Sequence, residues 1–195
     1  SETDRERLLA LGAPPELVRV LNSAKYELGE DHPNLVVQAG SVLREMLGEG
    51  RRVLLGGSTW PGEESVLVEI YRRARRQFPD LALVLAPRHV ERKAQVEEAL
   101  RAGCVPYCLR SDRESGRPPA DVDAMVLDTT GEVRYYYAHA DLIFIGKSLC
   151  AEGGQNIIEP AQFGKAVVVG PHMKNFPVVM DDFLQAEAIR QVRTA

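Results

Sequence analysis

Short apolar runs alternate with amphipathic segments along most of the chain. Apolar residues dominate six short runs, which are 52–57, 81–86, 104–109, 124–127, 142–145 and 166–169. Between the runs, apolar residues recur every three or four positions, which predicts helices at 66–78, 91–102, 133–138, 157–163 and 176–186. Strands and helices in this order indicate right-handed β-α-β units in a doubly wound, parallel α/β sheet that helices cover on both faces. Pro106 predicts that 104–109 is an edge strand.

The beginning of the chain lies outside this alternation. Residues 3–11 predict a short helix that Thr3 caps and Gly12 ends. Residues 29–34 carry glycine, aspartate, proline and asparagine, which predict a turn or linker, and an apolar-periodic segment follows at 36–47. Both ends of the chain carry helical patterns without polar tails, so we expect a fragment of a longer protein.

Composition narrows the class of protein. The 195 residues include 24 Lys and Arg against 28 Asp and Glu, so a net charge of −4 gives no field that would recruit nucleic acid. Three cysteines without Cys-x-x-Cys spacing indicate reduced thiols, and neither a disulfide scaffold nor a zinc site. No apolar run approaches the length of a membrane span, and the charged beginning excludes a signal peptide. The four histidines form no metal-binding pair.

The loops that follow the strands carry the candidate chemistry, because ligands of open α/β sheets bind beyond the carboxyl ends of the strands. Gly56 and Gly57 precede Ser58 and Thr59 at the end of the first run. This loop predicts either a tight turn with a capped helix or a cradle for phosphate. It matches neither the Walker A motif nor the dinucleotide glycine fingerprint. Arg88 and His89 follow the second run, as anion contacts or as a solvated arginine with a capping histidine.

The segment 146–160 is the most informative. Asn156 and Glu159 have the spacing of a capping box, which alone would explain a helix start. A capping box needs no preceding glycine pair, however, and Gly153-Gly154 together with Lys147-Ser148 favour contact with an anionic ligand. Glu159 can also accept hydrogen bonds from sugar hydroxyls. The arginines at 72–76 predict a solvated helix face in preference to a membrane patch, and Tyr135–Tyr137 predict helix packing.

Taken in order, these loops resemble the C-terminal domain of the 3-deoxy-D-manno-octulosonic acid (Kdo) transferases. The resemblance is carried by the runs 57–59 with 62–64, 86–89 with 91–92, 128–132, 146–160, 164–165, 170–172 and 175–176, and by 1–26 at the beginning. It implies a GT-B glycosyltransferase with two Rossmann-like domains, of which this chain carries the second. Residues 1–28 would be the end of the N-terminal domain and the interdomain linker. Residues 29–195 would be the Rossmann-like domain that binds the nucleotide sugar, with last helices that could be truncated.

The resemblance also implies a reaction. Kdo would pass from CMP-Kdo to a lipid A precursor at the cytoplasmic face of the inner membrane, with inversion and without a metal or cofactor. The catalytic base and the membrane anchor would lie in the missing N-terminal domain of the same protein, so we expect the isolated chain to be soluble and inactive. The implied donor-binding residues are Ser58, Thr59, Arg88, His89, Thr129, Gly131, Glu132, Lys147, Ser148, Gly153, Gly154, Gln155, Asn156 and Glu159, with His172 and Asn175 at the edge of the cleft.

Four residues depart from the resembled pattern, and other functions remain open. Trp60 and Gln155 stand where histidine is common, Lys147 where a second glycine is common, and Ala166 where proline is common. Within the same fold, the chain could belong to a UDP-sugar transferase or epimerase. It could also be a non-catalytic nucleotide-binding module, because it offers no convincing general base.

Overall fold

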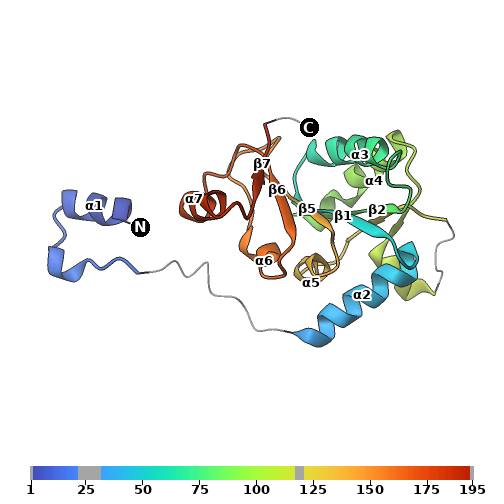
Figure 1. Cartoon of the computed structure of the whole chain (residues 1–195), viewed down its shortest axis with the longest axis horizontal. Helices are drawn as coiled ribbons and strands as arrows, with labels where there is room; N and C mark the ends of the chain where they lie inside the picture. The colour runs from blue at the N-terminus through green and yellow to red at the C-terminus, as the bar shows by residue number, and fades with distance from the viewer. Residues whose placement is uncertain (1, 22–31, 117–120, 194–195) are drawn as a thin grey trace. The chain divides into compact units, whose positions relative to one another are not determined.

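The computed structural model describes residues 2–21, 32–116 and 121–193, which fall into two units, Ser1–Asp31 and His32–Ala195 (Figure 1). The first unit contains helix α1 (Glu2–Ala10) and a 3₁₀ turn, η1 (Pro15–Leu17). The predicted helix is confirmed, and it ends before Gly12, which has a φ of 89°. The predicted cap is wrong, because Thr3 lies inside the helix and not before it.

The second unit is built on a seven-stranded parallel sheet with the order β3-β4-β2-β1-β5-β6-β7. The strands are β1 (Arg52–Thr59), β2 (Leu81–Pro87), β3 (Tyr107–Leu109), β4 (Ala124–Val126), β5 (Leu142–Ile145), β6 (Ala166–Val169) and β7 (Arg190–Gln191). Every pairing is parallel, which confirms the predicted doubly wound sheet. β3 is an edge strand, as Pro106 predicts. The sequence did not predict β7, because two exposed residues leave no apolar run.

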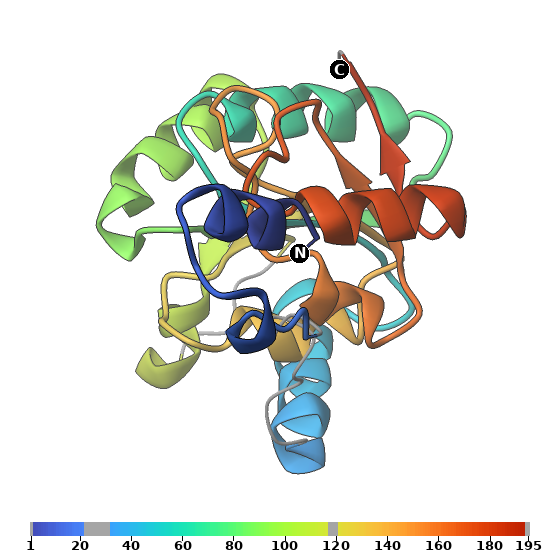
Figure 2. The same ribbon diagram turned by 90° about the vertical axis from the view of Figure 1, so that its left-hand side faces the viewer.

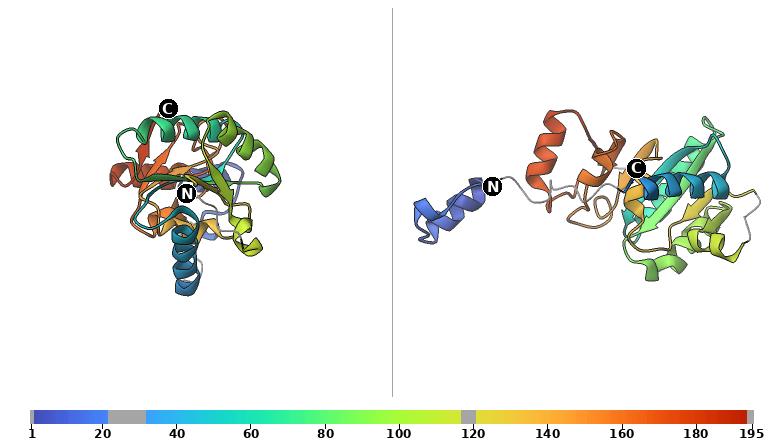
Figure 3. Two further views of the ribbon diagram at one scale, coloured as in Figure 1. Left: turned by 90° about the vertical axis from the view of Figure 1, so that its right-hand side faces the viewer. Right: turned by 90° about the horizontal axis from the view of Figure 1, so that it is seen from below.

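Helices cover both faces of the sheet. They are α2 (Pro33–Leu47), α3 (Glu63–Ala74), α4 (Lys93–Ala102), α5 (Val133–Tyr137), α6 (Ile158–Ala161) and α7 (Pro177–Gln185), with 3₁₀ turns η3 (Val90–Arg92) and η4 (Arg110–Ser115). Figures 1, 2 and 3 show α3 and α4 on one face, with α2 and α5 on the other. The predicted helix 66–78 begins after α3 begins and ends after α3 ends, and the predicted helix 157–163 is longer than α6 at both ends.

Two expected loops differ in detail. Residues 29–31 of the predicted linker lie outside the described residues, whereas Pro33 and Asn34 already belong to α2. Proline suits this position, because the first turn of a helix has no partner for its N–H group. The predicted loop 110–121 contains η4, and its residues 117–120 are outside the described part.

The core is apolar on both sides of the central strands. Leu83, Val84 and Leu85 of β2 have no exposed surface, as expected of a parallel strand between two helical layers. Tyr136 and Tyr137 are also buried, which confirms that these tyrosines pack inside the domain. Because β2 and β5 flank β1 on opposite sides, the loops after these three strands converge at the carboxyl edge beside β1, where the strand order reverses.

Candidate functional site

A cavity of about 250 Å³ opens at the carboxyl ends of β1, β2 and β4. Its lining includes five of the residues that the sequence proposed for donor binding, namely Ser58, Arg88, His89, Thr129 and Gly131. The side chains of Arg88 and His89 are exposed at its mouth, and those of Ser58 and Thr129 are half-buried. The fold therefore gathers residues from three separate loops around one opening that has a cation at its rim.

Ser58 occupies an irregular position at the end of β1. The pairing of β1 with β2 shifts register between Gly57 and Thr59, and Ser58 has a φ of 53°. This left-handed conformation is uncommon for a residue with a side chain, and strained residues cluster at functional sites. The side chain of Ser58 forms a hydrogen bond with the Tyr137 hydroxyl. The pKa of Tyr137 is raised, mainly by complete burial and also by the nearby charge of Glu159.

Thr59 does not lie on the surface of the cavity. Its side chain is fully buried and donates a hydrogen bond of 2.8 Å to the Glu64 carboxylate. Arg92 donates to both oxygens of Glu64, at 2.9 and 3.1 Å, and also to the Thr59 carbonyl. The Thr59 hydroxyl thus belongs to an internal hydrogen-bond network with Glu64, and its predicted contact with the donor stays a prediction.

The glycine pair before Ser58 serves packing. A Cβ atom on Gly57 would lie 2.3 Å from the Tyr137 hydroxyl oxygen, and one on Gly56 would lie 2.5 Å from a Leu67 methyl group. The side chains of Tyr137 and Leu67 therefore pack directly against the backbone of these two glycines. Of the two alternatives that the sequence left open for this loop, these contacts favour the tight turn.

The loop that follows β5 is anchored by buried polar groups. The Glu63 side chain is fully buried, and its carboxylate accepts hydrogen bonds from the backbone N–H groups of Lys147, Ser148 and Leu149, at 2.9 to 3.0 Å. Ser148 is also fully buried; its hydroxyl donates to the Ile145 carbonyl and accepts from the Gly170 N–H. The Ser148 hydroxyl therefore links the end of β5 to the loop after β6, and its predicted contact with the donor stays a prediction.

The second glycine pair is likewise used inside the domain. Gly153 and Gly154 have φ values of 121° and 74°. The Gly153 N–H donates to the His172 carbonyl at 3.2 Å, and the Gly154 N–H donates to the Lys147 carbonyl at 2.7 Å. Both amides therefore donate within the chain, and the predicted contact of this glycine pair with an anionic ligand stays a prediction. The backbone N–H of Asn175 in turn donates to the Gly153 carbonyl, which brings both predicted cleft-edge residues next to this pair.

The predicted capping interaction at 156–159 forms in a modified way. The side-chain oxygen Oδ1 of Asn156 accepts a hydrogen bond from the Ile158 N–H at 3.0 Å. The side-chain Nδ2 of Asn156 donates to the Glu159 carboxylate at 3.0 Å. Glu159 thus bonds to the side chain of Asn156. In a capping box it would bond to the backbone N–H of Asn156 instead. Gln155 and Glu159 are half-buried, and Glu159 retains acceptor sites for further donors.

The loop after β4 is tied to a buried arginine. Glu132 accepts a hydrogen bond from Thr129 at 2.8 Å and one from Arg110 at 3.2 Å. Arg110, which is only 6% exposed, also donates to the Tyr136 hydroxyl. Glu132 therefore holds the loop beside the 250 Å³ cavity, and the charge of Arg110 offsets its negative charge.

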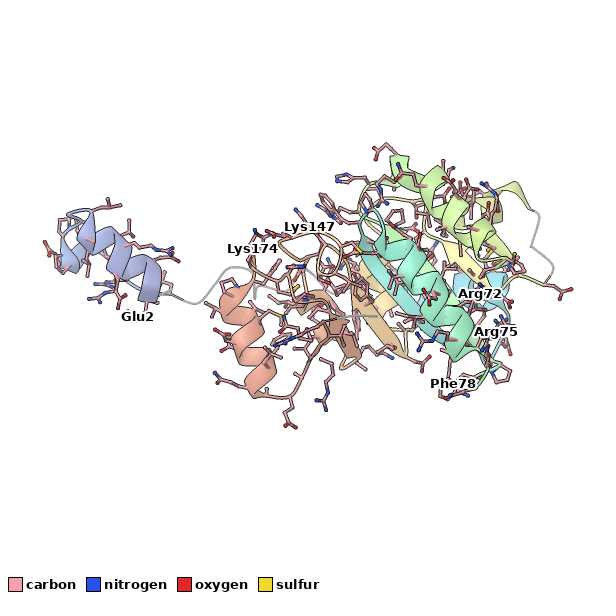
Figure 4. The ribbon with its side chains drawn as sticks, turned by 90° about the horizontal axis from the view of Figure 1, so that it is seen from above. Glu2, Arg72, Arg75, Phe78, Lys147 and Lys174 are labelled. Atoms are coloured by element: carbon pink, nitrogen blue, oxygen red, sulfur yellow. The ribbon has the colours of Figure 1, made fainter. Side chains whose placement is uncertain are left out.

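Lys147, in the loop after β5, and Trp60, in the loop after β1, form a cation–π pair. The Lys147 Nζ lies 4.4 Å from the centre of the Trp60 ring, and the Trp60 and His89 rings meet edge to face with centroids 5.9 Å apart. Gly146, the residue before Lys147, lies against Ser58, because a Cβ there would be 2.3 Å from the Ser58 carbonyl oxygen. Figure 4 shows Lys147 near the beginning of α3, at the end away from Arg72 and Phe78.

Sequence reasoning missed the residues that hold these loops in place. Glu63, Glu64, Arg92 and Arg110 received no role, although all four are buried or nearly so. The one local sign in the sequence is the acidic pair Glu63-Glu64 in the first turn of α3. A sequence pattern alone explains such a pair by its favourable interaction with the helix dipole.

Other candidate features lie elsewhere or are absent. A larger cavity of about 620 Å³ lies between α3 and strands β1, β5 and β6, but its lining is mainly apolar. Within residues 2–21, 32–116 and 121–193, no group of three His, Cys, Asp or Glu side chains could hold a metal ion. No helix in the described parts of the chain is long and apolar enough to cross a membrane.

Comparisons with known proteins point to one group of enzymes. No protein-family model matches the sequence. The chain is similar to the 3-deoxy-D-manno-octulosonic acid transferase of Haemophilus influenzae, with 28% identity over 189 residues that cover 97% of this chain and 43% of that protein. It is 37% identical over 142 residues to the transferase of the same name from Bordetella pertussis, across 71% of this chain and 33% of that protein. The chain thus spans less than half the length of these relatives.

A solved structure agrees with these relatives. The crystal structure of the C-terminal CMP-Kdo binding domain of WaaA from Acinetobacter baumannii is similar to this chain with a TM-score of 0.74 and 28% identity. The match covers 84% of each chain.

Proposed function

This chain is a relative of the Kdo transferases that corresponds to their C-terminal domain, and we propose that its 250 Å³ cavity binds the nucleotide part of CMP-Kdo. The observation that carries the proposal is the convergence of Arg88, His89 and Thr129 on this cavity at the carboxyl edge of the sheet. Ser58 and Thr129 are half-buried, and the Thr129 hydroxyl, which donates to Glu132, can still accept a hydrogen bond from a sugar or a base, as can that of Ser58.

Charge supports an anionic ligand at this edge. CMP-Kdo carries a phosphodiester and a carboxylate, and Arg88 is an exposed guanidinium that can bind either group with two parallel hydrogen bonds. Lys147 adds a second cation nearby. Glu159 would accept hydrogen bonds from the ribose hydroxyls with the oxygen sites that Asn156 leaves open.

In the reaction that we propose, these residues act on the leaving group. As the bond between Kdo and the phosphate breaks, negative charge grows on CMP, and cations fixed in advance stabilise that charge most strongly in the transition state. The acceptor hydroxyl of a lipid A precursor would attack from the opposite side, with inversion and without a metal ion. Its general base, the acceptor site and the membrane anchor would come from the part of the enzyme outside this chain, at the cytoplasmic face of the inner membrane.

Calorimetric titration of the chain with CMP tests the donor site, with UMP and NAD as controls. We expect selective binding of CMP, and Arg88→Ala or Glu159→Ala should weaken it by about tenfold or more, as the loss of a charge-assisted contact does. Arg101→Ala is the matched control, because Arg101 is an exposed arginine that pairs with Glu97 on α4. Preference for UMP would favour a UDP-sugar enzyme. Absence of CMP binding both here and in the full-length enzyme would refute the proposal.

A further inference from the structure

One buried carboxylate joins two loops at the proposed donor edge. Glu63, the first residue of α3, accepts hydrogen bonds from the N–H groups of Trp60 and Lys147 on one oxygen, at 2.8 and 2.9 Å. Its other oxygen accepts from Ser148 and Leu149, both at 3.0 Å. Each oxygen of an ionised carboxylate can accept two such hydrogen bonds. The amide of a glutamine in its place would offer one acceptor oxygen, and its NH₂ group would face N–H donors. The arrangement therefore depends on a carboxylate.

These hydrogen bonds determine where Lys147 lies. Lys147 has a φ of 57°, a left-handed conformation that side chains with a Cβ seldom adopt without support from surrounding structure. The bond from its N–H to Glu63 and the bond from Gly154 to its carbonyl hold the backbone on both sides. From this backbone the side chain reaches Trp60, where its ammonium lies within cation–π distance of the ring.

The charge of Lys147 is not neutralised where it lies. No carboxylate pairs with its ammonium among the residues that the structure describes, and Trp60 has no hydrogen-bond acceptor for its buried Nε1 there either. An aromatic face restricts a flexible ammonium without offering it an anion. The same Trp60 ring meets the ring of His89 edge to face, and His89 lines the 250 Å³ cavity.

We propose that Glu63 is a positioning residue and that it presents Lys147, resting on Trp60, as the contact for the phosphate of the nucleotide donor. This inference rests on the proposed function, and it adds the phosphate contact and the residues that orient it. Trp60 and Lys147 are both departures from the resembled pattern, and the fold brings these two departures together.

The test separates the phosphate from the rest of the nucleotide. Affinities for CMP and for cytidine are measured by calorimetry on the whole chain and on Lys147→Gln. We expect Lys147→Gln to weaken CMP binding about tenfold while cytidine affinity stays the same, because only CMP carries the phosphate. Lys174→Gln is the matched control, since Lys174 is an exposed lysine that pairs with Glu152. Equal losses for both ligands, or no loss for either, would overturn the assignment of Lys147.

A spectroscopic readout tests the role of Glu63. In lysine-labelled protein, the ε-methylene resonance of Lys147 should be displaced by the Trp60 ring current, and Lys147→Gln identifies it. Glu63→Gln should remove this displacement and reduce CMP affinity as much as Lys147→Gln, with no further loss in the double variant. Glu64→Gln is the control for loss of a buried carboxylate in the same turn, and it should keep the displaced resonance.

The outcomes distinguish this inference from the proposed function. An undisplaced Lys147 resonance in the unmodified chain, or an unchanged one in Glu63→Gln, would refute the positioning role even if CMP binds. If Glu63→Gln does not fold, Trp60→Leu provides the second variant, and it should remove the displacement and weaken CMP more than cytidine. Failure of the unmodified chain to bind CMP would contradict the proposed function and the phosphate contact together.

Discussion

At the scale of single residues, buried polar side chains hold the loops of the carboxyl edge together. Glu63 and Ser148 have no exposed surface, and Glu64 is 3% exposed. Each of these side chains forms hydrogen bonds with another loop of the same domain. Arg88 and His89 are exposed instead, and they are among the groups that a ligand can reach. A buried polar group that lacks a partner is costly, whereas an exposed one is solvated.

Ser148 offers a direct test of such a role. Ser148→Ala leaves the Gly170 N–H without its acceptor and the Ile145 carbonyl without its donor, both inside the domain. We expect the free energy of unfolding to fall by about 1–3 kcal/mol, measured by urea denaturation. Ser65→Ala, at an exposed position on α3, should change it little. An equal effect of the two variants would show that the hydroxyl of Ser148 has no structural role.

The ion pair between Arg92 and Glu64 gives a second test at this scale. Arg92→Met leaves an uncompensated carboxylate in a site where the side chain of Glu64 alone is only 4% exposed, so the free energy of unfolding should fall by about 3–5 kcal/mol. Arg92→Met combined with Glu64→Gln removes both charges and should recover part of this loss. A double-mutant cycle from urea denaturation measures the coupling, and additive effects would mean that the pair is not coupled.

At the scale of elements, the ends of the central strands pass close to side chains of the helices that cover them. Gly57 of β1 leaves room for the Tyr137 ring of α5, and Gly56 leaves room for Leu67 of α3. The strand is thus in contact with a helix on each face at adjacent positions. Neither residue has a positive φ, so the backbone conformation does not require glycine here. The close packing between the layers requires it, because a side chain would overlap the helix residues.

Gly57→Ala tests this packing. Its methyl group would overlap the Tyr137 hydroxyl and ring, so α5 must shift, and we expect a loss of about 1–3 kcal/mol in the free energy of unfolding. Tyr137→Phe removes the oxygen that is nearest to the new methyl group. In the Tyr137→Phe background the effect of Gly57→Ala on the urea midpoint should be smaller. The same effect in both backgrounds would exclude this contact as its cause.

At the scale of the whole molecule, a core enclosed by two helical layers includes ionisable groups in their neutral forms. Burial raises the pKa of the Cys108 thiol from its ordinary value of 9.0 to about 12. Burial also raises the pKa of Tyr136 from 10.0 to about 12. The unfolded chain releases these protons at lower pH than the folded one, so the free energy of unfolding is highest below the ordinary values and falls as pH rises towards 12.

Alkaline denaturation should reveal this coupling. Between about pH 9 and about pH 12, the Cys108 thiol alone should lower the free energy of unfolding by about 1.4 kcal/mol for each pH unit. Urea titrations at several pH values measure the slope, which Cys108→Ala should reduce. Cys104→Ala removes an exposed thiol and should retain the slope of the unmodified chain. An identical slope in Cys108→Ala would contradict the proposed contribution of this thiol.

The sequence was sufficient for the order of elements but not for the use of each polar group. Apolar runs such as 81–86 and 142–145 indicate strands, because a parallel strand that is buried on both faces consists almost entirely of apolar residues. The pattern cannot distinguish a hydroxyl at the surface, such as Ser58, from a buried one, such as Thr59. Nor can the pattern show that the amides of Gly153 and Gly154 bond within the chain to His172 and Lys147. Whether the predicted contacts of Arg88 and Glu159 with the donor form stays a prediction.

By itself, the sequence determined the parallel α/β architecture, the edge position of β3 and the loops on which candidate ligand contacts lie. These features depend on periodicity and on the geometry of proline and glycine, which are local properties of the chain. Only the tertiary structure decided that Glu63 joins the loops of Trp60 and Lys147, and that Lys147 rests on Trp60. Lys147 lies 84 residues after Glu63. Such contacts depend on how strands are ordered in the sheet, and no local pattern records that order.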